Sequence, residues 1–207
     1  MPAYKVPGYS VVTGPLAGTT EWVKQAAKWS NGALWDNGTY AMRNVRGTGS
    51  ADTRGVISNH ARGVAMDLSY RYIPARKLGV SNGRIKALNF INVVLDNWDA
   101  LGVQCVLDYF PDDHGRGWRV DRVDTLPAKA HNHQAWVRYQ RPTIHGAPGG
   151  DWLHVEITLG MANDAARVAK AFETVFGKST TAPQADATVE PQPKKGGKRR
   201  AGTGTAT

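Results

Sequence analysis

The chain has 207 residues, and its 26 Lys and Arg against 17 Asp and Glu give a formal charge of +9. Hydrophobic residues make up 41% of it, which is enough for one packed globular domain. No apolar run approaches the roughly 20 residues of a spanning helix, so we expect no stable membrane insertion. A single cysteine excludes an internal disulfide framework and a multi-cysteine zinc finger.

The composition changes at residue 178. Residues 178–207 contain no aromatic side chain, and six basic and two acidic residues give them a formal charge of +4. Such a stretch cannot bury enough apolar surface to fold, so we predict a folded domain over 1–177 and a disordered basic tail over 178–207. The tail's KKGGKRR cluster can bind nucleic acid, an acidic envelope polymer or anionic lipid headgroups, or it serves only solubility.

Two helices are predicted in the first half of the chain. The first spans Thr20–Trp29, where Trp22 and Ala26 recur at helical spacing. Residues 35–38 (WDNG) predict a turn, because Asn-Gly is a strong turn signal. The next helix is predicted to open at residues 81–83 and to end at Gly102. Its apolar residues recur at steps of three and four: Ile85, Leu88, Ile91, Leu95 and Trp98.

Strands are predicted in the second half. Val103–Tyr109 and Trp118–Val123 are joined by a polar loop, and apolar residues alternate along Leu153–Leu159. A last helix is predicted from a cap at Asn163, with Gly177 just past its end. Helices and antiparallel strands thus mix without regular βαβ alternation, which predicts an α+β fold.

Residues 58–67 (SNHARGVAMD) carry two side chains that can hold a metal ion. His60 offers an imidazole nitrogen and Asp67 a carboxylate oxygen. On a continuous strand they would lie on opposite faces, but Gly63 permits a sharp turn between them. Beyond that turn, small Ala65 shares a strand face with Asp67 and leaves room for an ion. Taken alone, a His and an Asp at this spacing more often occupy unrelated positions in the fold than bind one ion.

Residues 151–156 (DWLHVE) offer a third ligand. A strand here places His154 and Glu156 on one face. With His60 and Asp67, His154 completes three ligands and leaves one tetrahedral position for water, as in catalytic rather than structural zinc sites. Asp67 cancels one of the two charges of zinc, so the site keeps about +1 to acidify that water.

Two acids in the same segment have separate expected roles. Asp151 lies three residues before His154, in the turn before the strand, and can reach the water as general base. Glu156 is expected to orient an imidazole from behind; the alternative is a surface charge.

The two segments together resemble the zinc peptidases that cut bacterial cell-wall peptides. These are the D-alanyl-D-alanine carboxypeptidase and L-alanyl-D-glutamate endopeptidase family, including phage endolysins. The family pattern S-x-H-x-x-G-x-A-x-D is matched at all five fixed positions of residues 58–67. Its second pattern, an acid, two residues, a His, and often an apolar residue and an acid, is matched by residues 151–156, with Asp where many relatives carry Glu as the first acid.

The resemblance implies a small antiparallel sheet flanked by helices, a fold of the hedgehog/DD-peptidase type. It also implies one zinc ion, with Ser58 supporting the ligands and Trp152 contacting substrate. An upstream arginine is expected to bind a substrate carboxylate or carbonyl, because a guanidinium fork suits a carboxylate. Arg43 is our choice for this catalytic role and Arg46 the alternative in substrate binding; a solvated surface charge is the other interpretation of each.

The function that the resemblance implies is hydrolysis of peptide bonds in peptidoglycan stem peptides, at D-Ala-D-Ala or L-Ala-D-Glu. Residues 1–10 lack the hydrophobic stretch of a signal peptide, so we expect synthesis in a host cytoplasm and release through a holin, or presence in a virion, as for a phage endolysin in host lysis. The tail would then contact acidic wall polymers.

Two alternative functions remain. A non-catalytic, zinc-containing wall-binding protein on the same scaffold is disfavoured by Asp151, because a structural site needs no base. A nucleic-acid-binding protein acting through the tail is the less favoured hypothesis, and it predicts salt-sensitive binding that is lost without residues 178–207.

Overall fold

The structure is a computed structural model that describes residues 10–43, 57–109, 116–120, 137–138 and 150–177. The predicted basic tail, residues 178–207, lies outside these ranges, as does the end of the predicted strand Trp118–Val123.

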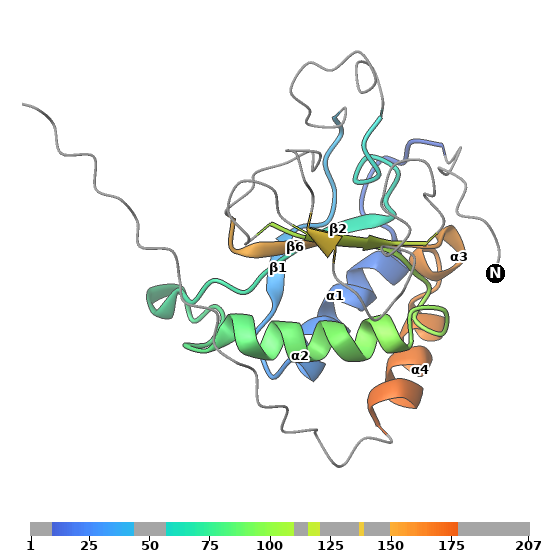
Figure 1. Cartoon of the computed structure of the whole chain (residues 1–207). Helices are drawn as coiled ribbons and strands as arrows, with labels where there is room; N and C mark the ends of the chain where they lie inside the picture. Colours follow the sequence, from blue (N-terminus) through green and yellow to red (C-terminus); the bar gives the residue numbers. More distant parts are fainter. Residues whose placement is uncertain (1–9, 44–56, 110–115, 121–136, 139–149, 178–207) are drawn as a thin grey trace, which may run out of the picture.

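The described residues form an α+β fold, as predicted, with one antiparallel sheet and helices on one side of it (Figure 1). The order of the sheet is β1-β2-β6-β3-β4-β5, so β2 and β6 are neighbours although they are far apart in the sequence. Its strands are β1 (Trp35–Gly38), β2 (Ala65–Ser69), β3 (Val103–Asp108), β4 (Arg116–Arg119), β5 (Val137–Arg138) and β6 (Trp152–Ile157). The helices are α1 (Ala17–Trp29), the 3-10 helix η2 (Pro74–Arg76), α2 (Gly83–Asp96), α3 (Leu159–Ala162) and α4 (Ala165–Phe176).

The first and last predicted helices are present as α1 and α4. α1 begins three residues earlier than predicted, and Trp22 and Ala26 are fully buried on it as expected. α4 is capped by Asp164 rather than by Asn163. The Asp164 carboxylate accepts a hydrogen bond from the backbone N–H of Arg167 at 2.9 Å, the usual contact of an N-cap side chain.

The predicted buried face of the middle helix is partly wrong. α2 ends at Asp96, and Ile85 on it is 37% exposed. Ala87 is fully buried instead, together with the predicted Ile91. Ile85 lies about 200° around the helix from Ala87, so the two cannot face the core together.

The predicted turn at residues 35–38 is instead the edge strand β1. The Asp36 carboxylate accepts a hydrogen bond from the Gly38 N–H at 2.8 Å, and Gly38 has a φ of 146°. The pairing with β2 becomes irregular between these two residues. The Asn-Gly signal therefore marks a local irregularity within a strand rather than a hairpin turn.

The remaining strand predictions hold with shifted ends. β3 agrees with prediction to within one residue, and β4 overlaps its predicted strand only at residues 118–119. β6 stops at Ile157 because the Thr158 hydroxyl accepts a hydrogen bond from the Met161 N–H and caps α3.

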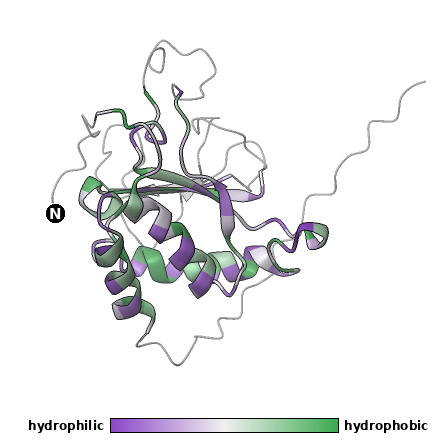
Figure 2. Ribbon diagram, turned by 180° about the vertical axis from the view of Figure 1, so that it is seen from behind, coloured by the Kyte–Doolittle hydropathy of each residue, from purple (hydrophilic) through white to green (hydrophobic). Residues whose placement is uncertain are grey.

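Alternate residues of the central strands face opposite sides of the sheet, which separates the core from the candidate site. Met66 and Leu68 of β2 and Leu153 and Val155 of β6 are fully buried in the core. Hydrophilic and hydrophobic residues alternate along the helices that cover this side, as expected for helices with one buried face (Figure 2). None of the helices within the described ranges is long and apolar enough to cross a bilayer.

A buried ionic cluster joins α2 to the sheet on the core side. Asp108 of β3 is fully buried, and Arg84 of α2 donates one hydrogen bond to each of its carboxylate oxygens at 3.2 Å. The Tyr70 hydroxyl donates to the same carboxylate at 3.1 Å. Burial, followed by the nearby charge of Asp108, raises the pKa of Tyr70 far above its usual range, so the hydroxyl stays protonated.

We expect Arg84→Ala to destabilise the fold by about 3–5 kcal/mol, because it removes the cation that donates to both oxygens of the buried Asp108 carboxylate. Urea unfolding followed by circular dichroism measures the change in the free energy of unfolding. Arg76→Ala, which removes an exposed arginine from η2, is the control and should change it by less than about 0.5 kcal/mol. Equal unfolding free energies for the two variants would contradict this assignment.

Candidate metal centre

A series of tight turns carries His60 to the sheet. The N–H groups of Ala61, Arg62 and Gly63 each donate to the carbonyl three residues earlier. Gly63 then adopts a φ of 72°, the left-handed conformation that glycine tolerates best, and the chain continues into β2. The Thr19 hydroxyl of α1 donates to the Gly63 carbonyl. The predicted turn at Gly63 is therefore present, and α1 fixes its position.

The pairing of β2 with β6 brings the other two predicted ligands together. Asp67 lies directly opposite His154 in the antiparallel register, and Ala65 lies opposite Glu156. All four belong to the face of the sheet that points away from the helical core. Ala65 shares the face of Asp67, as predicted.

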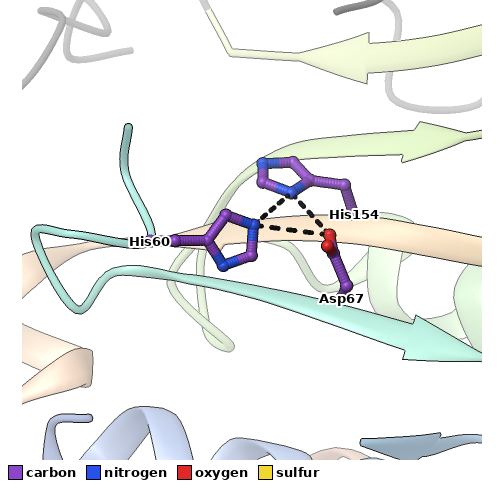
Figure 3. A group of neighbouring side chains, drawn as sticks. All are labelled: His60, Asp67 and His154. Carbon is purple, nitrogen blue, oxygen red and sulfur yellow. Dashed lines mark hydrogen bonds and ion pairs between the residues drawn. The ribbon is translucent and has the colours of Figure 1, made fainter. Parts of the chain in front are cut away.

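Three side chains converge on this face, as Figure 3 shows. His60 Nε2 lies 3.2 Å from His154 Nδ1 and 3.4 Å from Asp67 Oδ1. His154 Nδ1 lies 3.0 Å from the same oxygen. His60 is 4% exposed, whereas the Asp67 side chain is 21% exposed. The group is therefore largely enclosed but keeps an opening to solvent beside Asp67.

The spacing of these donor atoms suits one divalent ion. Bonds of about 2.0–2.1 Å from a tetrahedral ion to nitrogen and oxygen separate the ligand atoms by about 3.3 Å. The three separations, from 3.0 to 3.4 Å, are close to that value. His60, Asp67 and His154 can thus hold a metal ion with one position left for another ligand.

Glu156 lies behind this group, as expected. Its side chain is 9% exposed, and Oε1 lies 3.1 Å from His154 Nε2. Because an ionised carboxylate only accepts, the Nε2–H donates to it and leaves Nδ1 as the nitrogen that faces Asp67 and His60. This contact fixes the orientation and tautomer of the imidazole, as is usual for histidines that bind metal.

The charges at the centre also suit a cation. Burial alone would raise the pKa of Asp67, but hydrogen bonds with His154 and His60 hold it well below its usual range. Burial alone would lower the pKa of His154, but contacts with Asp67 and Glu156 raise it to about 9. Burial lowers the pKa of His60. Asp67 is therefore ionised at neutral pH at the point where both imidazoles meet, and a bound cation would replace the proton on His154.

Ser58 and Arg43 lie beside the turn that carries His60. The Ser58 hydroxyl accepts a hydrogen bond from the His60 backbone N–H at 3.3 Å, so it shapes the turn rather than touching an imidazole ring. The Ser58 N–H donates to the Arg43 carbonyl at 3.1 Å. Burial is the main cause of the lowered pKa of His60, and the Arg43 charge lowers it further. Arg46 lies outside the described residues.

Asp151 and Trp152 lie at the start of β6. The Asp151 carboxylate is not among the three converging ligands; in the part of the chain that the structure describes, it contacts Arg71, whose Nε donates to Oδ2 at 3.0 Å. Trp152 shares the face of His154 and packs against Tyr109, with ring centroids 5.5 Å apart. A side chain at Gly150 would collide with the Trp152 ring, so this glycine permits the ring to lie over the backbone.

Arg71 is the neighbour of the site that sequence reasoning missed. It lies four residues after Asp67, just beyond the end of β2. Once Asp67 is placed opposite His154, the antiparallel register brings Arg71 opposite the residues just before β6. The sequence therefore held the signal, but only in combination with the strand pairing.

Comparisons with protein-family models, with curated proteins and with solved structures found no match. The family resemblance thus rests on the two motifs.

We expect the wild-type chain to bind one zinc ion, and His60→Ala and Asp67→Asn each to weaken binding more than 100-fold, on the order expected for loss of one of three ligands. Competition with a chromophoric chelator measures the affinity, and elemental analysis measures the stoichiometry. Asp96→Asn, which neutralises an exposed carboxylate of α2, is the matched control and should bind as the wild type does. A wild-type chain that binds no zinc, or variants with unchanged affinity, would refute the site.

Glu156→Gln should weaken zinc binding less, by about 10- to 100-fold, because it removes the orienting carboxylate but no ligand. The same competition assay places it between Asp96→Asn and the two ligand variants. Should it match Asp96→Asn, Glu156 would have no part in orienting His154.

Proposed function

We propose that the chain is a zinc-dependent hydrolase that cleaves peptide bonds in bacterial peptidoglycan stem peptides. One observation carries the proposal: two separate motifs, residues 58–67 and 151–156, pair so that His60, Asp67 and His154 converge at metal-ligand spacing. The same three residues are the ones that the resemblance to the cell-wall zinc peptidases selects.

Zinc is the ion that this donor set favours. Two imidazoles and one carboxylate are ligands of catalytic zinc sites, which keep a further position for water or substrate. Among the described residues, no thiolate joins the group. Cys105 is buried on β3, where it pairs with Glu156 of β6 rather than with His154. A bound zinc ion would lower the pKa of a water molecule and polarise a peptide carbonyl.

The protein's own residues then divide the work of hydrolysis. Asp151 is the general base that accepts the proton of the attacking water and passes it to the leaving amine. Arg43, beside the turn of His60, stabilises the negative charge that develops on the carbonyl oxygen. Glu156 keeps His154 oriented, and the Trp152 ring, which packs against Tyr109, is the proposed contact for the substrate peptide.

The exposure of Asp67 favours catalysis over a purely structural ion. Structural zinc sites are closed by four protein ligands, whereas the residues that the structure describes bring three together here and leave an opening to solvent beside Asp67. A phage endolysin acting in host lysis is the biological setting that we propose, and it rests on the family resemblance alone.

Incubation of purified peptidoglycan with the zinc-loaded protein should release peptide fragments that a chelator abolishes. Mass spectrometry identifies the bond: loss of terminal D-Ala marks a carboxypeptidase, and separation of L-Ala from D-Glu marks an endopeptidase. His60→Ala, which loses zinc, should give no fragments. Intact peptidoglycan after incubation with the loaded wild type would refute the proposed function.

Asp151→Asn should retain zinc with wild-type affinity but lower kcat by about 100-fold or more, since the amide cannot accept the proton. Chelator competition and steady-state cleavage together separate metal binding from turnover. An Asp151→Asn protein that cleaves at the wild-type rate would show that another group is the base.

A further inference from the structure

Arg71 and Asp151 form an ion pair where β2 ends and β6 begins, beside the candidate site. Arg71 follows the end of β2 by two residues, and Asp151 immediately precedes β6. Because β2 and β6 are antiparallel, the end of β2 lies beside the start of β6. Arg71 Nε donates to Asp151 Oδ2 at 3.0 Å, and both side chains are partly exposed, at 51% and 41%.

The backbone around this ion pair is tightly held. The Arg71 N–H donates to the Ser69 hydroxyl at 3.1 Å, and the Arg71 carbonyl accepts from Trp35 Nε1 at 2.9 Å. The Asp151 carbonyl accepts from the Ser69 hydroxyl and from the Tyr70 N–H, both at 3.0 Å. The backbone that carries the guanidinium is therefore held in place by hydrogen bonds at the end of a strand.

The guanidinium has donors to spare. Of its five N–H groups, the pair with Asp151 engages Nε alone. Within the described ranges, its two terminal nitrogens have no protein partner, and half of the side chain is exposed. A guanidinium that is held through Nε can offer its other edge to a carboxylate in the two-pronged geometry that arginine favours.

We propose that Arg71 is a specificity-determining residue that binds a free carboxylate of the substrate peptide through its terminal nitrogens, while Asp151 holds Nε. This inference rests on the proposed function. Arg71 contacts Asp151, the proposed base, so it is placed to serve a group beside the cleaved bond, whereas the carbonyl of that bond is assigned to Arg43.

Stem peptides offer two such carboxylates, one on the D-glutamyl residue and one at the C-terminus. The test uses three synthetic stem peptides: the parent, one amidated at the D-glutamyl carboxylate, and one amidated at the C-terminus. For the wild type, we expect one amidated peptide to raise KM about five- to tenfold, as for the loss of one charge-assisted contact at a partly exposed site. That peptide identifies the carboxylate that Arg71 binds.

Arg71→Gln should raise KM for the parent peptide by the same five- to tenfold. Amidation should then raise KM no further, because Arg71 and the substrate carboxylate are the two partners of one contact. Arg76→Gln, which removes the same charge from exposed η2, is the matched control and should keep the wild-type KM ratios. Circular dichroism checks that both variants are folded.

Two results would overturn the inference in distinguishable ways. If the wild type cleaves the peptides but Arg71→Gln keeps every wild-type KM ratio, Arg71 does not bind the carboxylate, and the proposed function stands. If the zinc-loaded wild type cleaves neither the peptides nor peptidoglycan, the proposed function fails and this inference fails with it.

Discussion

β2 and β6 come from distant parts of the chain, yet their pairing in the middle of the sheet determines almost everything on the face away from the helices. It places Asp67 opposite His154, and it brings Arg71 and Asp151 together where β2 ends and β6 begins. A slip of one residue would turn one strand's ligand into the core and an apolar side chain out of it. The buried side chains Met66 and Val155, paired on the opposite face, therefore hold the register of the site.

On both faces of the sheet, carboxylates with little exposure lie beside groups that carry or can carry positive charge. On the core face, fully buried Asp108 is compensated within the protein by Arg84 and by the Tyr70 hydroxyl. On the other face, Asp67 contacts the imidazoles of His60 and His154, and Glu156 adds a second carboxylate behind His154. Two acids around two histidines leave room for positive charge, which a divalent ion supplies better than a shared proton.

Local sequence signals predicted the secondary structure that they directly encode. The presence of α1, α2, α4 and β6 was predictable from local sequence signals, although the end and part of the buried face of α2 were not, and the turn before β2 was predictable from Gly63. The edge strand β1 was not, because its irregular pairing with β2 is a tertiary effect that overrides the Asn-Gly signal. The three ligands were predictable as residue types, but their convergence depends on a register between strands about 90 residues apart, which no local pattern contains. The ion pair of Arg71 with Asp151 was missed for the same reason.

The most direct measurement of the central claim is crystallography of the zinc-loaded protein with anomalous data collected on both sides of the zinc absorption edge. We predict one zinc peak bound by His60 Nε2, Asp67 Oδ1 and His154 Nδ1 at about 2.0–2.1 Å, with a water molecule completing the coordination. A zinc peak elsewhere, or one in which either imidazole is not a ligand, would contradict it.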